Sequence, residues 1–436
     1  MAVLLWAHIH PSIGGAVNIK VASRMEAVGV RRSVITFEIV ARIVLLLVVP
    51  TVLPLVFFGD PLHYWRIAQK IDPTRAPYLQ WVPYRKVFWE YPPLTLPVLG
   101  LAKLAQGSFA LYRTLVGGTM IACELGCLNL LRRAWPAHWR SLTVVWNLTV
   151  LPIAVLTWFR LDFMVTLFAT MALLSIAQRT RGGAASIVAG FATKLWPVLM
   201  VAPLSMRRRW RDLALSVGGS AAALIAWYMW SPSGLTKFLN YRSTNGLELE
   251  SLLGGFALLG HHAAIHTQSG TWVLIDAGGS WAQPTLYLAL AVITALSFWR
   301  ARGPGTDMVA FSGALIVAAM LCSWILSPQY IVWAAPFVAV LAARGHRRIA
   351  VWYGGATVVT FLYLLEFQKW YATPGAHTTD PIAALAIIVR NALLIAVLVE
   401  MIVAIRPAPE SATGREMAAA WPGHAPAVAS SDLALP

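Results

Sequence analysis

Residues 382–405 read IAALAIIVRNALLIAVLVEMIVAI, an almost unbroken apolar run. About 20 such residues suffice for a helix to cross a lipid bilayer. Similar runs recur along the chain, at 36–58, 92–106, 109–131, 141–159, 161–178, 184–205, 212–230, 283–299, 307–326, 330–343 and 349–367. The pattern predicts an all-α polytopic membrane protein with about twelve transmembrane segments, some of them short or re-entrant.

The composition supports a membrane protein. Hydrophobic residues make up 58% of the chain and charged residues 12%, against about 25% charged residues in ordinary soluble domains. So few polar side chains cannot coat a water-exposed surface of this size. The net charge of +16 would suggest nucleic acid in a soluble protein. In a membrane protein, Lys and Arg gather in cytoplasmic loops that face anionic lipid, so we expect membrane lipids and no nucleic acid as partners.

The placement of Lys and Arg predicts which loops share a side of the membrane. Four loops are rich in arginine, at 132–140, 179–181, 207–211 and 344–348, and all four should be cytoplasmic. This holds only if 92–106 adds no crossing and 184–205 returns to its own side. We therefore expect 92–106 to lie along the outer surface or to continue 109–131 as one bent helix. We expect 184–205 to be a hairpin of two half-helices with Lys194 near its tip.

These assignments divide the chain into three parts. We expect residues 1–35 to form a cytoplasmic N-terminal arm and 36–405 to form a single transmembrane domain. Residues 406–436, rich in Ala, Pro and Ser, form a disordered cytoplasmic tail. Two long outer loops lie at about 59–91 and 231–282, and loops of this length usually carry function. We expect a multi-pass protein of the cell membrane with both termini cytoplasmic and its chemistry on the extracytoplasmic face.

Three charged residues at outer span ends are candidates for that chemistry. Asp60 follows the first span, where a partly desolvated carboxylate suits a general base; Asp before Pro is also a common helix start. Asp162, in Arg160-Leu161-Asp162, opens a later span, where such residues also simply cap or snorkel. Lys194 is costly inside an apolar hairpin unless it faces a polar cavity, and its ammonium suits a lipid-linked phosphate.

Other polar residues of the outer loops carry weaker signals. Glu250 lies in the second loop, and Gln329 and Tyr330 open a span end, where they bind a sugar hydroxyl or break and anchor a helix. His261, His262 and His266 lack a carboxylate partner at a fixed spacing, so a solvated loop is favoured over a metal site. Gly-rich nucleotide loops are absent from the sequence. We expect no cofactor; a divalent metal is not indicated.

Taken in order along the chain, these motifs resemble the GT-C glycosyltransferases, polytopic enzymes that use polyprenyl-phosphate sugars. Within them the chain most resembles the actinobacterial, PimE-like polyprenol-phosphate-mannose mannosyltransferases. The stretches that carry the resemblance are Asp60–Tyr64, Pro77-Tyr78, Tyr91-Pro92-Pro93, Arg160–Asp162, Lys194–Pro197, Glu250-Ser251 and Ser327–Trp333.

The resemblance implies a GT-C-like bundle and an inverting transfer of a sugar, mannose in the first place. The donor is a polyprenyl-phosphate sugar and the acceptor a lipid or glycan on the extracytoplasmic face, with Asp60 as the base. The leaving phosphate is anionic, so it needs cations, and Arg160 and Lys194 are the candidates. The residues that we expect to contact the sugar or the acceptor are His63, Tyr64, Tyr91, Asp162, Glu250, Gln329 and Tyr330.

Two alternatives remain open at this point. An arabinofuranosyltransferase that uses a decaprenyl-phosphate pentose differs from a mannosyltransferase in pocket shape, which the sequence does not display. A secondary transporter or lipid flippase accounts for the spans and for Lys194 but not for two long outer loops with clustered carboxylates. Polar residues that converge at the outer face favour an enzyme, whereas a site at the bilayer midplane favours transport.

Overall fold

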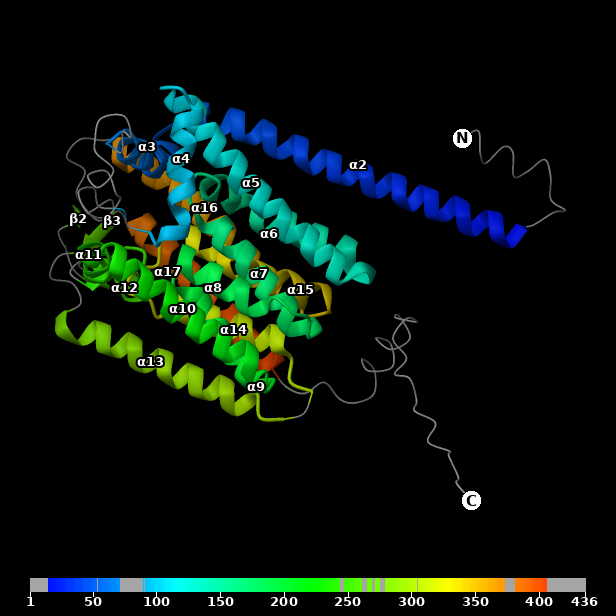
Figure 1. Ribbon diagram of the computed structural model, residues 1–436. Helices are drawn as coiled ribbons and strands as arrows, with labels where there is room; N and C mark the ends of the chain where they lie inside the picture. Colours follow the sequence, from blue (N-terminus) through cyan, green and yellow to red (C-terminus); the bar gives the residue numbers. More distant parts are fainter. Residues whose placement is uncertain are drawn as a thin grey trace, which may run out of the picture.

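The computed structural model describes residues 15–405, except 53, 71–88, 90, 244–246, 261–264, 269–270, 275–278, 304 and 373–380. These residues form a bundle of helices with a small sheet at one end (Figure 1). The N-terminal residues 1–14 and the tail 406–436 lie outside the described part of the chain. The expectation of a disordered tail therefore stays a prediction.

The N-terminal part is more helical than we expected. Helix α2 (Gly15–Val52) contains most of the predicted arm and the start of the first span in one continuous element. Helix α3 (Pro54–Lys70) follows at once and includes residues that we assigned to the first outer loop. Pro61, Tyr64 and Ile67 are all buried, and this spacing of three residues places them on one helix face. That buried face explains why a segment of loop-like composition is a helix.

Of the two alternatives for 92–106, the bent helix with 109–131 is wrong, and the placement along the outer surface stays a prediction. A short 3₁₀ turn η1 (Pro93–Thr95) leads into α4 (Leu96–Leu104), and α5 (Phe109–Ala134) is a separate helix. Gln106 and Gly107 have φ of 47° and 86°. Two successive residues in the left-handed region turn the chain out of the helical path, so α4 and α5 cannot be one helix. Ser108 then caps α5 by accepting a hydrogen bond from the Leu111 N–H at 3.2 Å.

The half-helix pair at 184–205 matches the expectation. After α6 (Trp139–Thr157) and α7 (Asp162–Gln178), α8 (Gly183–Thr193) ends at Lys194, whose backbone is extended, and η3 (Trp196–Met200) and α9 (Val201–Met206) follow. A Cβ on Gly190 would lie 2.9 Å from the Pro197 Cβ, so η3 packs closely back against α8. The chain therefore reverses at Lys194. Helix α10 (Trp210–Trp230) packs beside the pair.

The second predicted outer loop, 231–282, contains regular structure. It holds α11 (Pro232–Ser243), β1 (Leu247–Glu248), α12 (Leu252–Gly260), β2 (Ile265–Gln268) and β3 (Thr271–Leu274). The strands form an antiparallel sheet in the order β1-β3-β2. This sheet is the one element of the described chain that an all-α prediction did not include. It places β1 at the edge of the bundle, next to Trp324, whose carbonyl accepts the Glu248 N–H.

The C-terminal half supplies the centre of the bundle. Its elements are α13 (Gly279–Arg300), α14 (Met308–Leu321), η4 (Pro328–Ala334), α15 (Ala335–Ala343), α16 (Arg347–Ala372) and α17 (Pro381–Ala404). Helix α14, η4 and α15 are buried along almost their whole length. The outer helices instead expose large apolar side chains, among them Val44 on α2, Met229 on α10, Leu288 on α13 and Val351 on α16. An apolar exterior of this extent fits a lipid environment.

Five helices of the described chain are long and apolar enough to cross a membrane: Phe109–Ala134, Trp210–Trp230, Ala282–Arg300, Arg347–Glu366 and Pro381–Ala404. Several of the other predicted spans are shorter apolar helices, including α7, α8 and α14. The predicted segments, about twelve in number, thus correspond in the described chain to five helices of sufficient length to span a membrane and to a set of shorter apolar helices.

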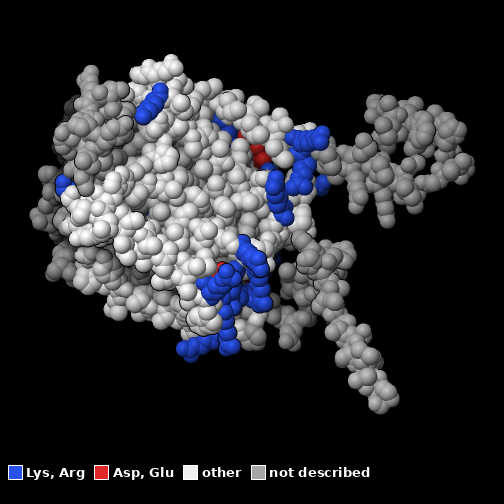
Figure 2. All heavy atoms as spheres, in the orientation of Figure 1, with Lys and Arg blue, Asp and Glu red and all other residues white. Residues whose placement is uncertain are grey.

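The arginine-rich loops lie together at one end of the bundle. The Gln178 amide donates to the Ala134 carbonyl at 3.1 Å, and Arg209 donates to the Thr180 carbonyl at 2.8 Å. Figure 2 shows most of the visible Lys and Arg side chains gathered toward this end. Helix α7 leads from it to Asp162, and its 17 residues span about 25 Å. The predicted site residues therefore lie at the opposite end from the arginine-rich loops.

Candidate active site

An ion pair joins Asp60 on α3 to Arg160 in the turn between α6 and α7. The Arg160 Nε lies 2.9 Å from the Asp60 Oδ2, and the two side chains are 30% and 28% exposed. Arg160 also donates from Nη1 to the Gln329 Oε1 on η4. Three segments distant in sequence therefore meet at one guanidinium. Desolvation, the largest single effect, lowers its pKa, but the combined influence of Asp60 and its other acidic neighbours raises the pKa above its ordinary value, so Arg160 stays a cation.

A second, deeper ion pair involves Lys194. Its Nζ lies 2.7 Å from the Asp162 Oδ1, and the side chains are 13% and 1% exposed. The Trp333 indole N–H donates to the same oxygen at 2.7 Å. Among the described residues, the other oxygen, Oδ2, has no hydrogen-bond partner. Asp162 is the first residue of α7, where the helix dipole stabilises a negative charge.

Aromatic rings surround the ammonium group of Lys194. Its Nζ lies 4.2 Å from the ring centroid of Tyr330, 4.9 Å from that of Trp333 and 5.9 Å from that of Tyr91. The rings of Tyr330 and Trp333 stack with their centroids 4.2 Å apart, and the Trp196 ring stacks on Trp333 with a centroid distance of 5.0 Å. Ring faces attract a cation, so this arrangement accounts for a charged lysine in an apolar hairpin.

The predicted contact residues of the first outer loop differ in burial. The hydroxyls of Tyr64 and Tyr91 lie 2.9 Å apart, and both rings pack on Trp89. Tyr64 is fully buried and Tyr91 nearly so, so these two side chains pack in the interior next to the site. His63 is exposed, with its ring centroid 6.4 Å from that of Tyr64.

Two glutamates form an acidic group near the Arg160 side of the site. The Ser327 hydroxyl donates to the Glu248 Oε1 at 2.8 Å, and the Arg390 guanidinium donates to the backbone carbonyl of Glu250. Burial raises the pKa of Glu250 to about 8, and Glu248 adds to the rise. Arg390 and Arg160 oppose it. Glu250 is therefore protonated for much of the time at neutral pH and offers a hydroxyl donor.

An apolar cavity of about 350 Å³ opens beside Lys194. Its lining comes from η1, α8 and α10: Pro92, Pro93, Leu94, Phe191, Ala192, Leu195, Ala223, Leu224, Ala226, Trp227 and Trp230. Leu195 directly follows Lys194, and Pro92 directly follows Tyr91. The cavity thus reaches the two segments whose side chains meet at the ammonium group.

Some residues of this region were missed from the sequence. Trp333 entered only as the end of the Ser327–Trp333 stretch, and neither Glu248 nor Arg390 was singled out. Arg390 is a charge inside an apolar run, and that signal predicts a polar partner. The described residues contain no group of three or more His, Cys, Asp or Glu that could hold a metal. His261 and His262, and the side chain of His266, lie outside the described part.

The sequence was compared with known proteins. Residues 89–328 match the model of Glycosyltransferase family 87, which is more than half of the chain. The match includes Arg160, Asp162 and Lys194, whereas Asp60 precedes it and Gln329 follows it. No curated protein and no solved structure matches the chain.

Proposed function

The chain belongs to glycosyltransferase family 87, and we propose that this membrane glycosyltransferase takes its sugar from a polyprenyl phosphate. The acceptor is a hydroxyl of a lipid or glycan. Mannose is the sugar to test first, because the motifs resemble those of polyprenol-phosphate-mannose mannosyltransferases. The proposal rests on one observation: Lys194, which forms an ion pair with Asp162, directly precedes Leu195 in the lining of an apolar cavity.

Cations next to an apolar cavity suit a substrate that has both an anionic group and a hydrophobic chain. A polyprenyl chain has no polar groups, and the cavity is lined almost entirely by aliphatic and aromatic side chains. The phosphate that ends the chain needs cations, which Lys194 and Arg160 supply. A soluble nucleotide-sugar donor would leave the apolar cavity without a role.

The proposed reaction is a direct displacement at the anomeric carbon. The acceptor oxygen forms a bond to that carbon while the bond from the carbon to the phosphate oxygen breaks. The hydroxyl proton passes to the Asp60 carboxylate, and the electron pair of the broken bond leaves with the polyprenyl phosphate. A single displacement inverts the anomeric configuration. Asp60 is only 28% exposed, and its ion pair with Arg160 fixes its orientation before the acceptor arrives.

The structure suggests different roles for residues that we grouped as sugar or acceptor contacts. Asp162 is 1% exposed and bound to Lys194, so we assign it to positioning that cation. Gln329 accepts a hydrogen bond from Arg160, and Glu250 lies near enough to feel its charge; both are assigned to sugar or acceptor hydroxyls. Tyr330 is buried between Trp333 and Lys194, so we assign it to holding that cation. His63 is exposed and fits an acceptor that approaches from solvent.

The position of the site favours an enzyme over a transporter. Its residues come from the ends of α6 and α8 and the starts of α7 and η4, away from the arginine-rich end. A transporter would place its polar site near the midplane, open in turn to both sides. By the placement of Lys and Arg, the site end is extracytoplasmic.

An in vitro transfer assay tests this proposal. The purified full chain in lipid nanodiscs is given polyprenyl-phosphate-mannose, or polyprenyl-phosphate-arabinose, with extracted membrane lipids as acceptors. We expect transfer from the mannose donor, with an anomeric configuration opposite to that of the donor. Transfer from the arabinose donor alone would mean that the sugar is arabinose and not mannose, while the proposed reaction would stand. Turnover with a soluble nucleotide sugar, and with neither lipid-linked donor, would overturn the proposal.

A further inference from the structure

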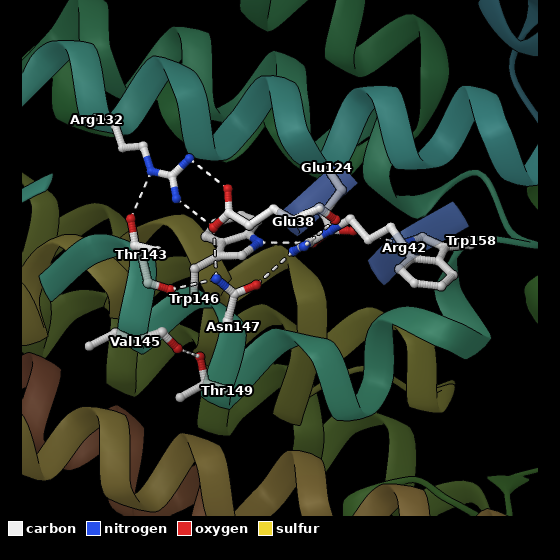
Figure 3. Close-up of polar contacts among 10 residues, drawn as sticks. All are labelled: Glu38, Arg42, Glu124, Arg132, Thr143, Val145, Trp146, Asn147, Thr149 and Trp158. Atoms are coloured by element: carbon white, nitrogen blue, oxygen red, sulfur yellow. Dashed lines mark hydrogen bonds and ion pairs between the residues drawn. The ribbon is translucent and has the colours of Figure 1, made fainter. Parts of the chain in front are cut away.

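A network of charged side chains is buried between α2, α5 and α6, outside the site described above (Figure 3). It contains two ion pairs, Arg42–Glu124 and Arg132–Glu38, each with a closest N–O distance of 2.5 Å. All four side chains are at most 5% exposed. Asn147 on α6 bridges the pairs by donating to the Glu38 Oε1 at 2.9 Å and accepting from the Arg42 Nη2 at 3.0 Å.

Buried ion pairs are costly unless every partner is satisfied. Here the carboxylate of Glu124 accepts from Arg42 at Oε1 and from two indole N–H groups, Trp146 at 3.1 Å and Trp158 at 2.8 Å. Both tryptophans are fully buried. Glu124 therefore ties α5 to α2 through Arg42 and to α6 through both tryptophans.

The two tryptophans hold different parts of α6. Trp146 lies within the helix, whereas Trp158 is the residue that follows its last turn. Arg160, the partner of Asp60, comes two residues after Trp158, and the Arg160 N–H closes the turn by donating to the Thr157 carbonyl at 3.0 Å. The Trp158 bond to Glu124 thus anchors the turn that presents Arg160.

The contact of Glu124 with Arg42 connects it to the helices that carry Asp60. Arg42 is on α2, which passes into α3, the helix that carries Asp60. Leu46, one turn after Arg42, packs over Gly117 on α5, where an added Cβ would lie 2.4 Å from the Leu46 Cδ1 and 3.3 Å from the Phe159 ring. Helix α2 and the turn after α6 therefore meet on the same patch of α5.

We propose that Glu124 is a positioning residue for the transfer reaction, because its carboxylate sets the relative placement of Asp60, through Arg42 and α2, and of Arg160, through Trp158. This rests on the proposed function. A half-exposed ion pair such as Asp60–Arg160 stabilises too little to hold two segments in register by itself. A misplacement of about 1 Å at a reacting group is enough to slow catalysis strongly.

The chain offers a matched pair of substitutions. Trp158→Phe and Trp146→Phe each remove one buried indole N–H from the same carboxylate, but only Trp158 adjoins the Arg160 turn. We expect Trp158→Phe to lower kcat at least about tenfold and, because Arg160 also binds the donor phosphate, to raise the donor KM. We expect Trp146→Phe to keep kcat within about twofold at a similar thermal midpoint. Equal kcat losses, or losses that follow the thermal midpoints, would overturn the proposal.

A second pair covers the case in which a phenylalanine variant does not fold. Glu124→Gln and Glu38→Gln each remove one carboxylate charge from an equally buried ion pair of α2 and α5. Only Glu124 contacts the end of α6, so kcat should fall in Glu124→Gln and remain near that of the wild type in Glu38→Gln. The reverse order, or no difference, would contradict the positioning role.

Hydrogen–deuterium exchange separates this inference from the proposed function, because it needs no substrate. Peptides that cover residues 157–162 should exchange faster in Trp158→Phe than in the wild type, and at the wild-type rate in Trp146→Phe. If the wild-type protein transfers no sugar but the two variants show this exchange pattern, the proposed reaction is refuted and the structural role of Glu124 stands. Unchanged exchange in Trp158→Phe would refute the positioning role, whatever the activity.

Discussion

The carboxylate of Asp60 and the guanidinium of Arg160 form an ion pair of 2.9 Å between α3 and the turn after α6. Arg160 reaches Gln329 with another nitrogen, so the pair connects the first third of the chain to its last. Both side chains stay partly exposed, whereas the neighbouring Lys194–Asp162 pair is almost buried. An exposed carboxylate beside a fixed cation is available to a substrate, and a buried one is available only to its lysine.

This contrast predicts the behaviour of Lys194. Lys194→Met alone should lower stability strongly, because it leaves the buried Asp162 charge unpaired, at a cost of about 3–5 kcal/mol. The double variant Lys194→Met/Asp162→Asn removes both charges and should recover most of the thermal midpoint. If Lys194 binds the donor phosphate, the donor KM of the double variant stays raised at least about tenfold.

Steady-state kinetics in nanodiscs and thermal unfolding check this prediction. Lys103→Met on α4 is the control, since Lys103 is exposed and lies in no part of the site. A double variant with the wild-type donor KM would show that Lys194 serves the fold and not the phosphate.

The apolar cavity predicts a dependence on the length of the donor chain. Ala223→Trp on α10 fills part of the space that we assign to the polyprenyl group. We expect it to raise the KM of a long-chain donor while leaving that of a short-chain, water-soluble analogue nearly unchanged. Ala222→Trp on the same helix is exposed and not part of the lining, so it should affect neither KM. Equal effects of Ala223→Trp on both donors would place the lipid elsewhere.

The raised pKa of Glu250 predicts a pH dependence of stability. Its pKa is about 8 in the folded protein, against 4.5 as the ordinary value, chiefly because of burial. Between these pH values the folded state keeps a proton that the unfolded state has lost. The free energy of unfolding should therefore fall as pH rises from about 4.5 to 8, and level off above that.

Thermal unfolding between pH 5 and pH 9 tests this sign. Glu250→Gln carries no titrating proton at this position, so its midpoint should fall less over the window than that of the wild type. Glu400→Gln on α17, which alters a loose ion pair of 3.9 Å with Arg348, should keep the wild-type slope. A Glu250→Gln slope equal to that of the wild type would mean that Glu250 is ionised in the folded protein.

Much of the candidate site could be predicted from single residues. Asp60, Arg160 and Lys194 stood out because a charge at a span end, or inside an apolar hairpin, needs a partner or a cavity. The structure brings all three together with Asp162, Gln329 and Tyr330. The pairing itself, Asp60 with Arg160 and Asp162 with Lys194, depends on tertiary placement and has no signature in the spacing.

The fold was less predictable where local and long-range effects compete. Hydropathy located most helices, and the break at Lys194 was visible as a lysine between short apolar runs. Hydropathy did not show that residues 54–70 continue as a helix, because the buried face of α3 exists only in the packed bundle, chiefly against α4 and α5. Glu38, Arg42 and Glu124 also escaped notice, and Arg132 was assigned to an arginine-rich loop although it lies in α5 and pairs with Glu38. They lie in or beside long apolar runs, and only the packed bundle shows that they pair.

The most direct test of the account is the rate of sugar transfer by Asp60→Asn. The substitution is nearly isosteric and removes the proposed proton acceptor, and Arg160 stays partly solvated, so the fold should survive. Asp212→Asn is the control, since Asp212 also pairs with an arginine, Arg209, at 2.5 Å, but on α10 at the arginine-rich end. We predict that transfer from the lipid-linked donor falls at least about a hundredfold in Asp60→Asn and stays near the wild-type rate in Asp212→Asn. Near-normal transfer by a well-folded Asp60→Asn protein would contradict the account.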